Sequence, residues 1–224
     1  MIYSNSEVRS LSWENIHTIF TLKKGATYQP IRVLSYAIDY HFWKLNPLGY
    51  HFTNIFFYIL TCCMVFFTLR LLSSHLRNRA SPDSHVRVAL FGSLLFAAHP
   101  VHVEAVTWLA ARKEVLQGFF FFSAFYLYMV GREKEGKGRL IFLGLTLFFI
   151  LLATLSKPSA VVFPGVIIIY EIAMGQEKIF DYLKRHWLFC SLSLIISGIF
   201  IFILMKVMLE AGGIKPFRGD SFLS

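Results

Sequence analysis

Long apolar runs alternate with short polar stretches along most of the chain. Six apolar segments are long enough to cross or nearly cross a bilayer, since one membrane helix takes about 20 residues. They run approximately over 53–72, 86–99, 115–130, 140–156, 160–174 and 187–208. We expect the short second segment to continue into a buried bundle and the short fifth to begin inside the "SKPSAVVFPG" bend. The pattern predicts an all-α fold, a polytopic transmembrane helical bundle of about six spans.

The first fifty residues show the periodicity of amphipathic helices. In "SLSWENIHTIF", Trp13, Ile16 and Phe20 share one helical face, and Ser12 is suited to cap the helix. "PIRVLSYAIDYHFW" begins with Pro30, a residue type favoured at the first helical position. Its apolar stripe contains Ile31, Leu34, Ile38 and Phe42, and its polar stripe contains Arg32, Ser35, Tyr36 and Asp39. We expect both helices to lie in the membrane interface.

Composition supports a membrane protein and excludes other classes. Hydrophobic residues make up 56% of the 224 and charged residues 16%, against about 45–50% and about 25% in soluble domains. The net charge of +9 does not indicate a nucleic-acid partner, because no basic stripe with interleaved aromatics lies outside the apolar blocks. The three cysteines fall inside apolar spans and form no CxxC pair.

Charged loops predict the orientation. The loops between the apolar segments alternate between a more cationic set and a less cationic set. The positive-inside rule places the more cationic loops in the cytoplasm. Residues 1–50 and the stretches around His99, Lys157 and Lys215 are then on the other face. We divide the chain into an outer-face loop (1–50), a transmembrane domain (51–209) and the start of a further outer loop (210–224). The cytoplasmic set contains Arg77, Arg79, Arg87, Arg132, Lys134, Lys137, Arg139, Lys178, Lys184 and Arg185, and the opposite set Arg112, Lys113, Lys157, Lys215 and Arg218.

The stretch "HPVHVEAVTW" carries unusual polarity between two apolar segments. Pro100 is suited to open a helix, and His99 and His102 are three residues apart. A zinc site on these two histidines is geometrically possible but lacks a third ligand, because Glu104 points elsewhere. A second interpretation is a capped helix start with hydrogen-bonded histidines in an interface loop. The third is a substrate-facing role, since ionisable groups at membrane depth usually line a cavity.

Three further cations each allow two interpretations. Arg112 lies eight residues after Glu104, so both could face one cavity, and its planar fork suits a phosphate; it could equally anchor the span by snorkelling. Lys157, before a proline, either binds a phosphate or marks the interface. Arg32 and Asp39 are expected to form a surface pair, with substrate contact as the alternative.

Three strings carry a resemblance to a known family: "YQPIRVLSYAIDYHFWKLNPLGYHFTNI", "FAAHPVHVEAVTWLAARKEVL" and "LATLSKPSAVVFPGVIII". Together and in this order they resemble the membrane domain of GT-C glycosyltransferases, in particular the tetratricopeptide-linked transmembrane O-mannosyltransferases and their bacterial relatives. Tyr28 and Pro30 match the family's Y-x-P element, and Lys157 and Pro158 match SKP. The HPxHxEAV…GRxELL element is matched by His99, Pro100, His102, Glu104, Arg112 and Glu114, with Ala111 where the family often has glycine.

The resemblance implies inverting transfer of a sugar, such as mannose, from a polyprenyl-phosphate donor to a protein hydroxyl at the outer face. An acidic base would activate the hydroxyl, and Arg112 with His99 or His102 would stabilise the leaving phosphate while Glu104 orients one of these cations. Tyr28, Arg32 and Lys157 complete the expected substrate-binding set. The implied partners are the lipid-linked sugar, an acceptor protein and membrane lipids; the need for a divalent cation is left open. We expect a bacterial inner membrane, or the endoplasmic reticulum in a eukaryote.

The chain departs from the family at its start. The family's acidic pair would come before Met1, and Asp39 is too far along to replace it. We therefore expect a fragment of a larger enzyme or a mis-started one. The alternative is a non-catalytic membrane scaffold or accessory module of the same fold. A transporter is disfavoured because the charges gather at span ends rather than at the midplane.

Overall fold

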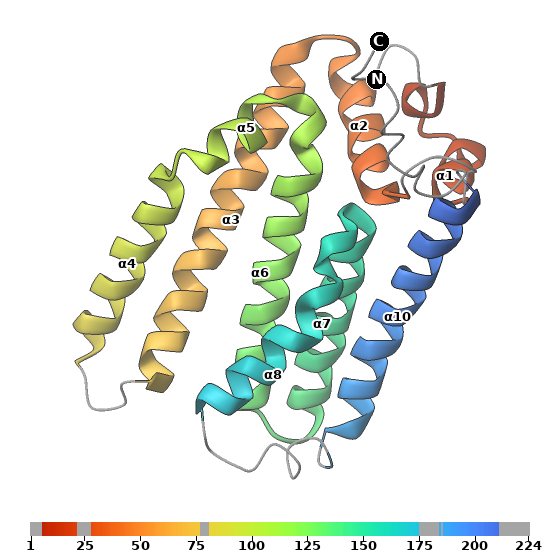
Figure 1. The fold of residues 1–224 in the computed structure, drawn as a ribbon. Coiled ribbons are helices and arrows are strands. Elements are labelled where there is room, and N and C mark those ends of the chain that lie inside the picture. Colours follow the sequence, from red (N-terminus) through yellow and green to blue (C-terminus); the bar gives the residue numbers. More distant parts are fainter. Residues whose placement is uncertain (1–5, 22–27, 77–80, 175–183, 185, 211–224) are drawn as a thin grey trace, which may run out of the picture.

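The computed structural model describes residues 6–21, 28–76, 81–174, 184 and 186–210, and these ranges contain helices and connecting turns only. The long helices run roughly side by side as a bundle (Figure 1). The α-helices are α1 (Trp13–Phe20), α2 (Pro30–Trp43), α3 (Pro47–Leu76), α4 (Pro82–Ala98), α5 (Val101–Thr107), α6 (Arg112–Arg132), α7 (Gly136–Ser156), α8 (Phe163–Met174) and α10 (Trp187–Glu210). The 3-10 helices are η1 (Ser6–Arg9), η2 (Leu109–Ala111) and η3 (Pro158–Val162). The predicted all-α membrane bundle is confirmed.

In the described part of the chain, the number of candidate spans is four or five, fewer than the predicted six. Four helices of the described chain are long and apolar enough to cross a membrane: Pro47–Leu76, Leu109–Arg132, Gly136–Ser156 and Trp187–Val207. Helices α4 and α5 qualify only together and meet at an angle of 65°, which makes a fifth span if they count as one. The apolar helix over Pro158–Met174 is too short. Helices end at His99–Pro100 and at Lys157–Pro158. These interruptions leave helical segments shorter than a span requires.

The two N-terminal helices begin where the sequence predicts. Ser12 caps α1, and its hydroxyl accepts from the Asn15 amide at 3.3 Å. Pro30 opens α2. In α2 the polar stripe faces the protein, because Asp39 is buried, whereas the apolar Phe42 is 73% exposed. An outward apolar stripe suits a helix whose surroundings are lipid.

Two clusters of buried side chains form the interior. The larger joins α6, α7, α8 and α10 and contains Tyr128, Met129, Ile150, Phe163 and Ile167. Helices α6 and α7 approach closely at Gly131, where an added Cβ would lie 2.7 Å from the Phe142 Cβ. The smaller cluster holds Val8, Tyr36 and Tyr50 and ties the N-terminal segment to α3.

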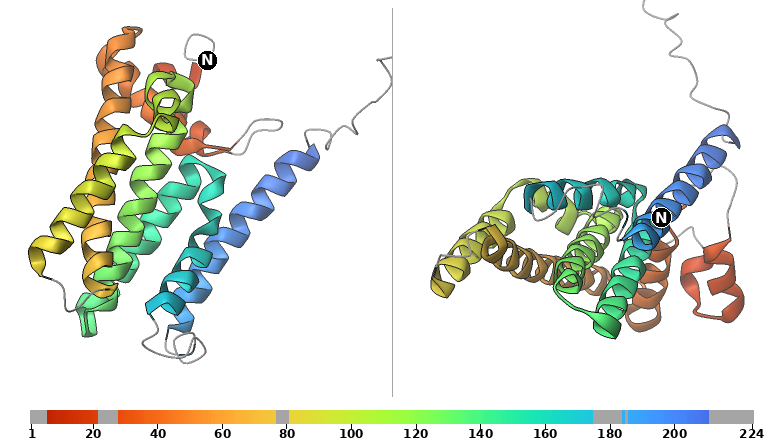
Figure 2. Two further views of the ribbon diagram at one scale, coloured as in Figure 1. Left: turned by 60° about the vertical axis from the view of Figure 1, so that its left-hand side comes forward. Right: turned by 90° about the horizontal axis from the view of Figure 1, so that it is seen from below.

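One end of the bundle gathers most of the predicted site residues. Helices α2 and α5 and the turn η2 lie at the same end, away from the α6–α7 turn (Figures 1 and 2). Helix α2 and the His-Pro stretch therefore lie at the same end of the bundle. Their placement outside the cytoplasm stays a prediction, and the predicted cytoplasmic residues Arg77, Arg79, Lys178 and Arg185, like most of the predicted loop 210–224, lie outside the described residues.

Candidate functional site

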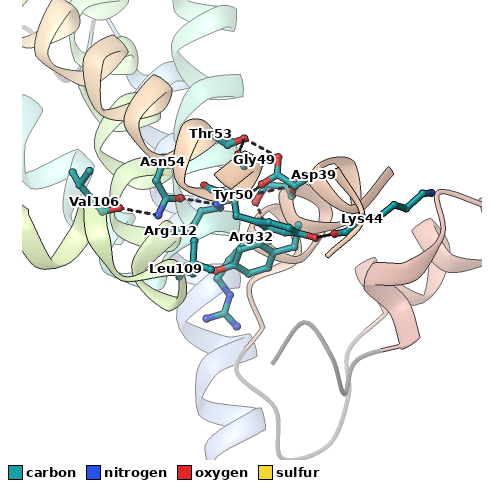
Figure 3. Close-up of polar contacts among 12 residues, drawn as sticks. Arg32, Asp39, Lys44, Gly49, Tyr50, Thr53, Asn54, Val106, Leu109 and Arg112 are labelled. Carbon is teal, nitrogen blue, oxygen red and sulfur yellow. Dashed lines mark hydrogen bonds and ion pairs between the residues drawn. The ribbon is translucent and has the colours of Figure 1, made fainter. Parts of the chain in front are cut away.

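Arg112, the first residue of α6, is fully buried at the end of the bundle where α2 and α5 lie (Figure 3). Its Nε donates to the Asn54 side-chain oxygen at 2.8 Å, and its Nη2 donates to the Tyr50 carbonyl at 2.6 Å. Its Nη1 forms an ion pair with Asp39. The guanidinium thus has protein partners on all three nitrogens, as a buried charge requires.

Two tyrosine rings complete the enclosure of this guanidinium. Its central carbon lies 4.7 Å from the ring centre of Tyr36 and 5.8 Å from that of Tyr50. The Tyr36 hydroxyl donates to the Leu109 carbonyl at 2.5 Å. Burial raises the pKa of Tyr36, so the hydroxyl keeps the proton that it donates. Rings over a cation add attraction beyond the hydrogen bonds.

The same network joins four elements from separate parts of the sequence. The Asn54 amide donates to the Val106 carbonyl at 3.3 Å, and the Thr53 hydroxyl donates to Asp39 at 2.8 Å. Helices α2, α3, α5 and α6 therefore meet around one charge (Figure 3). The predicted surface pair between Arg32 and Asp39 is wrong, because Asp39 is buried and pairs with Arg112.

Arg32 points away from this network in Figure 3. It is half-buried, and its Nε is enclosed with no hydrogen-bond partner among the described residues. Burial lowers the pKa of its guanidinium. An arginine that is only half-buried can still present part of its guanidinium to an anionic ligand.

The His-Pro stretch forms a corner between α4 and α5. His99 caps the C-terminus of α4, and its Nδ1 accepts from the Val101 amide at 3.2 Å. The ring of His102 is half-buried, with ring centres 4.3 Å from Phe96 and 6.0 Å from His99. The structure brings the two histidines together, and the described part of the chain has no group of three metal-ligating side chains. Glu104 is exposed, so it does not share a cavity with the enclosed Arg112.

Lys157 and Tyr28 lie on other elements of this end. Lys157 forms an ion pair with Glu114, and both side chains remain about one-third exposed, at 30% and 34%. Beside this pair, Gln117 donates to the Ser159 hydroxyl at 2.9 Å. The Tyr28 hydroxyl donates to the Phe20 carbonyl at 3.1 Å, and the Tyr28 ring centre lies 6.0 Å from that of Phe200 in α10.

A second polar cluster, at the opposite end of the bundle, was not predicted. Glu171 is buried, accepts from the Tyr128 hydroxyl at 2.5 Å and pairs with Arg132 at 2.8 Å. The ring nitrogens of His75 lie 2.8 Å from the Tyr170 hydroxyl and 2.5 Å from Glu133. The signal that could have revealed it is the one carboxylate within the apolar run "VIIIYEIAM", because ionisable residues in membrane helices need partners.

Comparison with known proteins places this geometry in context. The chain is 34% identical over 152 residues to the human Protein O-mannosyl-transferase TMTC3. The aligned region covers 67% of this chain and 15% of that protein. It is 31% identical over 165 residues to Tmtc3 of Drosophila melanogaster (67% and 18%) and 28% identical over 172 residues to human TMTC4 (71% and 23%). The chain therefore spans less than a quarter of the length of these relatives.

No family model and no solved structure matches the chain. The three relatives named above are animal proteins, so they give no support to the predicted bacterial inner membrane. The identities nevertheless extend over two-thirds of the chain, and the helical membrane bundle agrees with them. The chain is a distant homologue of the TMTC protein O-mannosyl-transferases.

Proposed function

We propose that this protein acts as a membrane glycosyltransferase that moves mannose from a polyprenyl-phosphate donor to a hydroxyl of a protein acceptor. The observation that carries the proposal is the match over 67% of the chain to a protein named for O-mannosyl transfer. In a eukaryote the membrane would be that of the endoplasmic reticulum, with the site on the face away from the cytoplasm.

The geometry supports a different division of roles from the one implied by resemblance. Arg112 has no exposed surface, so we assign it to positioning α2, α3 and α6 rather than to contact with the donor phosphate. Arg32 is half-buried and Lys157 is 30% exposed, so both remain partly accessible. Helix α2 also packs against α7, which ends next to Lys157. These two cations are our candidates for binding the phosphate.

The remaining predicted residues keep supporting roles in the proposal. Glu114 would hold Lys157 in place, and Tyr28 would form part of the wall next to α10. His99, His102 and Glu104 form the α4–α5 corner, where His99 and His102 would provide further contacts for an anion or for the acceptor.

The proposed reaction is a single displacement. A base removes the proton of the acceptor hydroxyl, whose oxygen attacks the anomeric carbon while the bond from that carbon to the phosphate oxygen breaks. The phosphate leaves with the electron pair, and neighbouring cations stabilise its new charge. The resemblance implies that this base is an acidic side chain.

Mannose transfer by the intact protein, from polyprenyl-phosphate mannose to an acceptor protein, tests the proposal. Lys157→Ala and Arg32→Ala should each lower turnover by about 10²-fold, the usual cost of losing a donor that stabilises a developing negative charge. Lys134→Ala, an exposed cation in the α6–α7 turn, serves as the matched control and should leave turnover unchanged. Normal turnover in both site variants would refute these assignments.

A non-catalytic scaffold of the same fold is the second candidate. It is favoured by the internal pairing of polar groups, since Arg112 with Asp39 and Lys157 with Glu114 already have protein partners. A scaffold should show no transfer in the intact wild-type protein with any polyprenyl-phosphate sugar. Transfer by the wild-type protein would exclude it.

A further inference from the structure

A cavity of about 440 Å³ lies between the first turns of α7 and α10. It is at the end of the bundle opposite to α2 and α5, where α7 and α10 begin (Figures 1 and 2). Its walls are apolar and include Leu143, Leu147 and Leu192, and Gly144 leaves its floor open because a Cβ there would meet no atom within 4 Å. Its mouth is polar.

Two nitrogen-rich side chains form this mouth. Nη2 of Arg139 lies 2.8 Å from Nδ1 of His186, and both residues line the cavity. Among the described lining residues there is no carboxylate. The arginine keeps its charge at any physiological pH, so the mouth offers a cation to whatever fills the cavity.

Among the described residues of the neighbouring α6–α7 turn, cations outnumber carboxylates. In the α6–α7 turn, Arg132 is paired with Glu171 and Glu133 with His75. The remaining charged groups of this turn are three cations and one carboxylate, namely Lys134, Lys137, Arg139 and Glu135. The surroundings of the mouth are thus complementary to an anion.

The cavity also lies at the ends of two candidate spans, α7 and α10, where a headgroup region is expected. Trp187, at the first position of α10, lines it and is 64% exposed, and Leu140 on the first turn of α7 is 68% exposed. Tryptophan is enriched at the membrane–water boundary. A cation above apolar walls, at a span end, matches an anionic amphiphile.

We propose that this cavity binds an anionic phospholipid, with the phosphate at Arg139 and His186 and one acyl chain along the leucine walls. The site is independent of the proposed sugar transfer, because it lies at the other end of the bundle and shares no residue with it. It would favour anionic over zwitterionic lipids of the same acyl composition.

Native mass spectrometry of the purified protein in mixed micelles tests the charge requirement. With equimolar phosphatidylglycerol and phosphatidylcholine of identical chains, we expect at least a fivefold preference for phosphatidylglycerol. Arg139→Gln should abolish the preference. Lys137→Gln removes a neighbouring exposed cation that does not line the cavity and should leave the preference unchanged. Equal retention of both lipids, or equal losses in the two variants, would overturn the proposal, since general surface charge would then suffice.

A second pair of variants tests the apolar part without touching the charges. Gly144→Leu places a side chain into the cavity and should displace the lipid. Gly198→Leu in α10 is the matched control, because its Cβ also meets no atom within 4 Å and Gly198 is not a lining residue. Lipid retention in Gly144→Leu at the wild-type level would refute the site. Unchanged helical content by circular dichroism confirms that both variants fold.

Two further measurements distinguish other occupants. An excess of soluble glycerol phosphate should fail to displace the lipid, and displacement would indicate a simple phosphate site instead. A photoreactive diazirine residue at Leu192, irradiated in membranes of the expressing cell, should yield a lipid adduct. A cross-link to a protein segment would show that the cavity holds polypeptide and would overturn the assignment.

Discussion

The enclosure of Arg112 is the strongest constraint at the scale of single residues. Its guanidinium bonds to Asp39, Asn54 and the Tyr50 carbonyl with no exposed surface. Taking an ion pair out of water costs several kcal/mol per ion, and only complete pairing offsets this. Removing one partner therefore leaves an uncompensated charge in the interior.

Asp39→Ala and Arg112→Ala should each lower the free energy of unfolding by about 3–5 kcal/mol. The apolar double variant Asp39→Leu with Arg112→Met removes both charges at similar volume and should recover most of that loss. Unfolding by detergent titration in mixed micelles gives the comparison. Lys113→Ala, next to Arg112 and without a described ion pair, should change stability by less than about 0.5 kcal/mol. A double variant as unstable as the singles would contradict this account.

At the scale of single residues, the sequence does not reveal ion pairs between residues that are far apart along the chain. Asp39 and Arg112 are 73 residues apart, whereas the spacings considered from sequence, Arg32 to Asp39 and Glu104 to Arg112, lie within single segments. Helical periodicity reports which residues share a face, not which faces meet. The resemblance marked Arg112 as part of a motif, but its buried surroundings follow only from the packing.

Helix α2 shows what periodicity can and cannot determine at the scale of an element. Its start at Pro30 and its two stripes follow from the sequence. The direction of the stripes does not, because the usual rule of apolar side inward assumes water outside. With lipid outside, the polar side turns inward, and Asp39 becomes buried while Phe42 stays exposed.

The α6–α7 hairpin depends on a small residue at its contact. Gly131→Ala would place a Cβ 2.7 Å from the Phe142 Cβ, so the helices must separate, at an expected cost of about 1–3 kcal/mol. Gly165→Ala in α8 meets no atom within 4 Å and should be neutral or stabilising by up to about 1 kcal/mol. Thermal unfolding followed by circular dichroism compares the two. Equal melting temperatures would argue against close packing at Gly131.

At the scale of the whole molecule, the lengths of the apolar runs predicted the helical bundle. They overestimated the number of spans found in the described residues. The runs at 86–99 and 160–174 are apolar enough for a membrane span. The helices are interrupted at Pro100 and Pro158, however, and are therefore short. Local composition does not reveal whether a proline bends a span or ends it. The polar cluster around Glu171 was missed for a related reason, since one carboxylate hardly changes the average hydropathy of its segment.

The shared end of α2 and α5 leads to a topology prediction. In a background with Cys62, Cys63 and Cys190 replaced, Trp13→Cys and Glu104→Cys should react with an impermeant maleimide from the same side of sealed vesicles. Lys137→Cys, in the α6–α7 turn, should react only from the opposite side, which the positive-inside rule makes cytoplasmic. Labelling of Trp13→Cys and Glu104→Cys from different sides would contradict the described packing.

The cage around Arg112 also has a consequence for biosynthesis. Translation delivers α2 and α3, with Asp39 and Asn54, to the translocon before α6 leaves the ribosome. On insertion scales an unpaired arginine costs about 2.5–3.5 kcal/mol at the centre of a membrane helix and less toward its end, where Arg112 lies. Partners that are already in place would reduce this cost when the late cation arrives. Deleting α2 should therefore slow the membrane integration of α6 during translation, before the tertiary structure has formed.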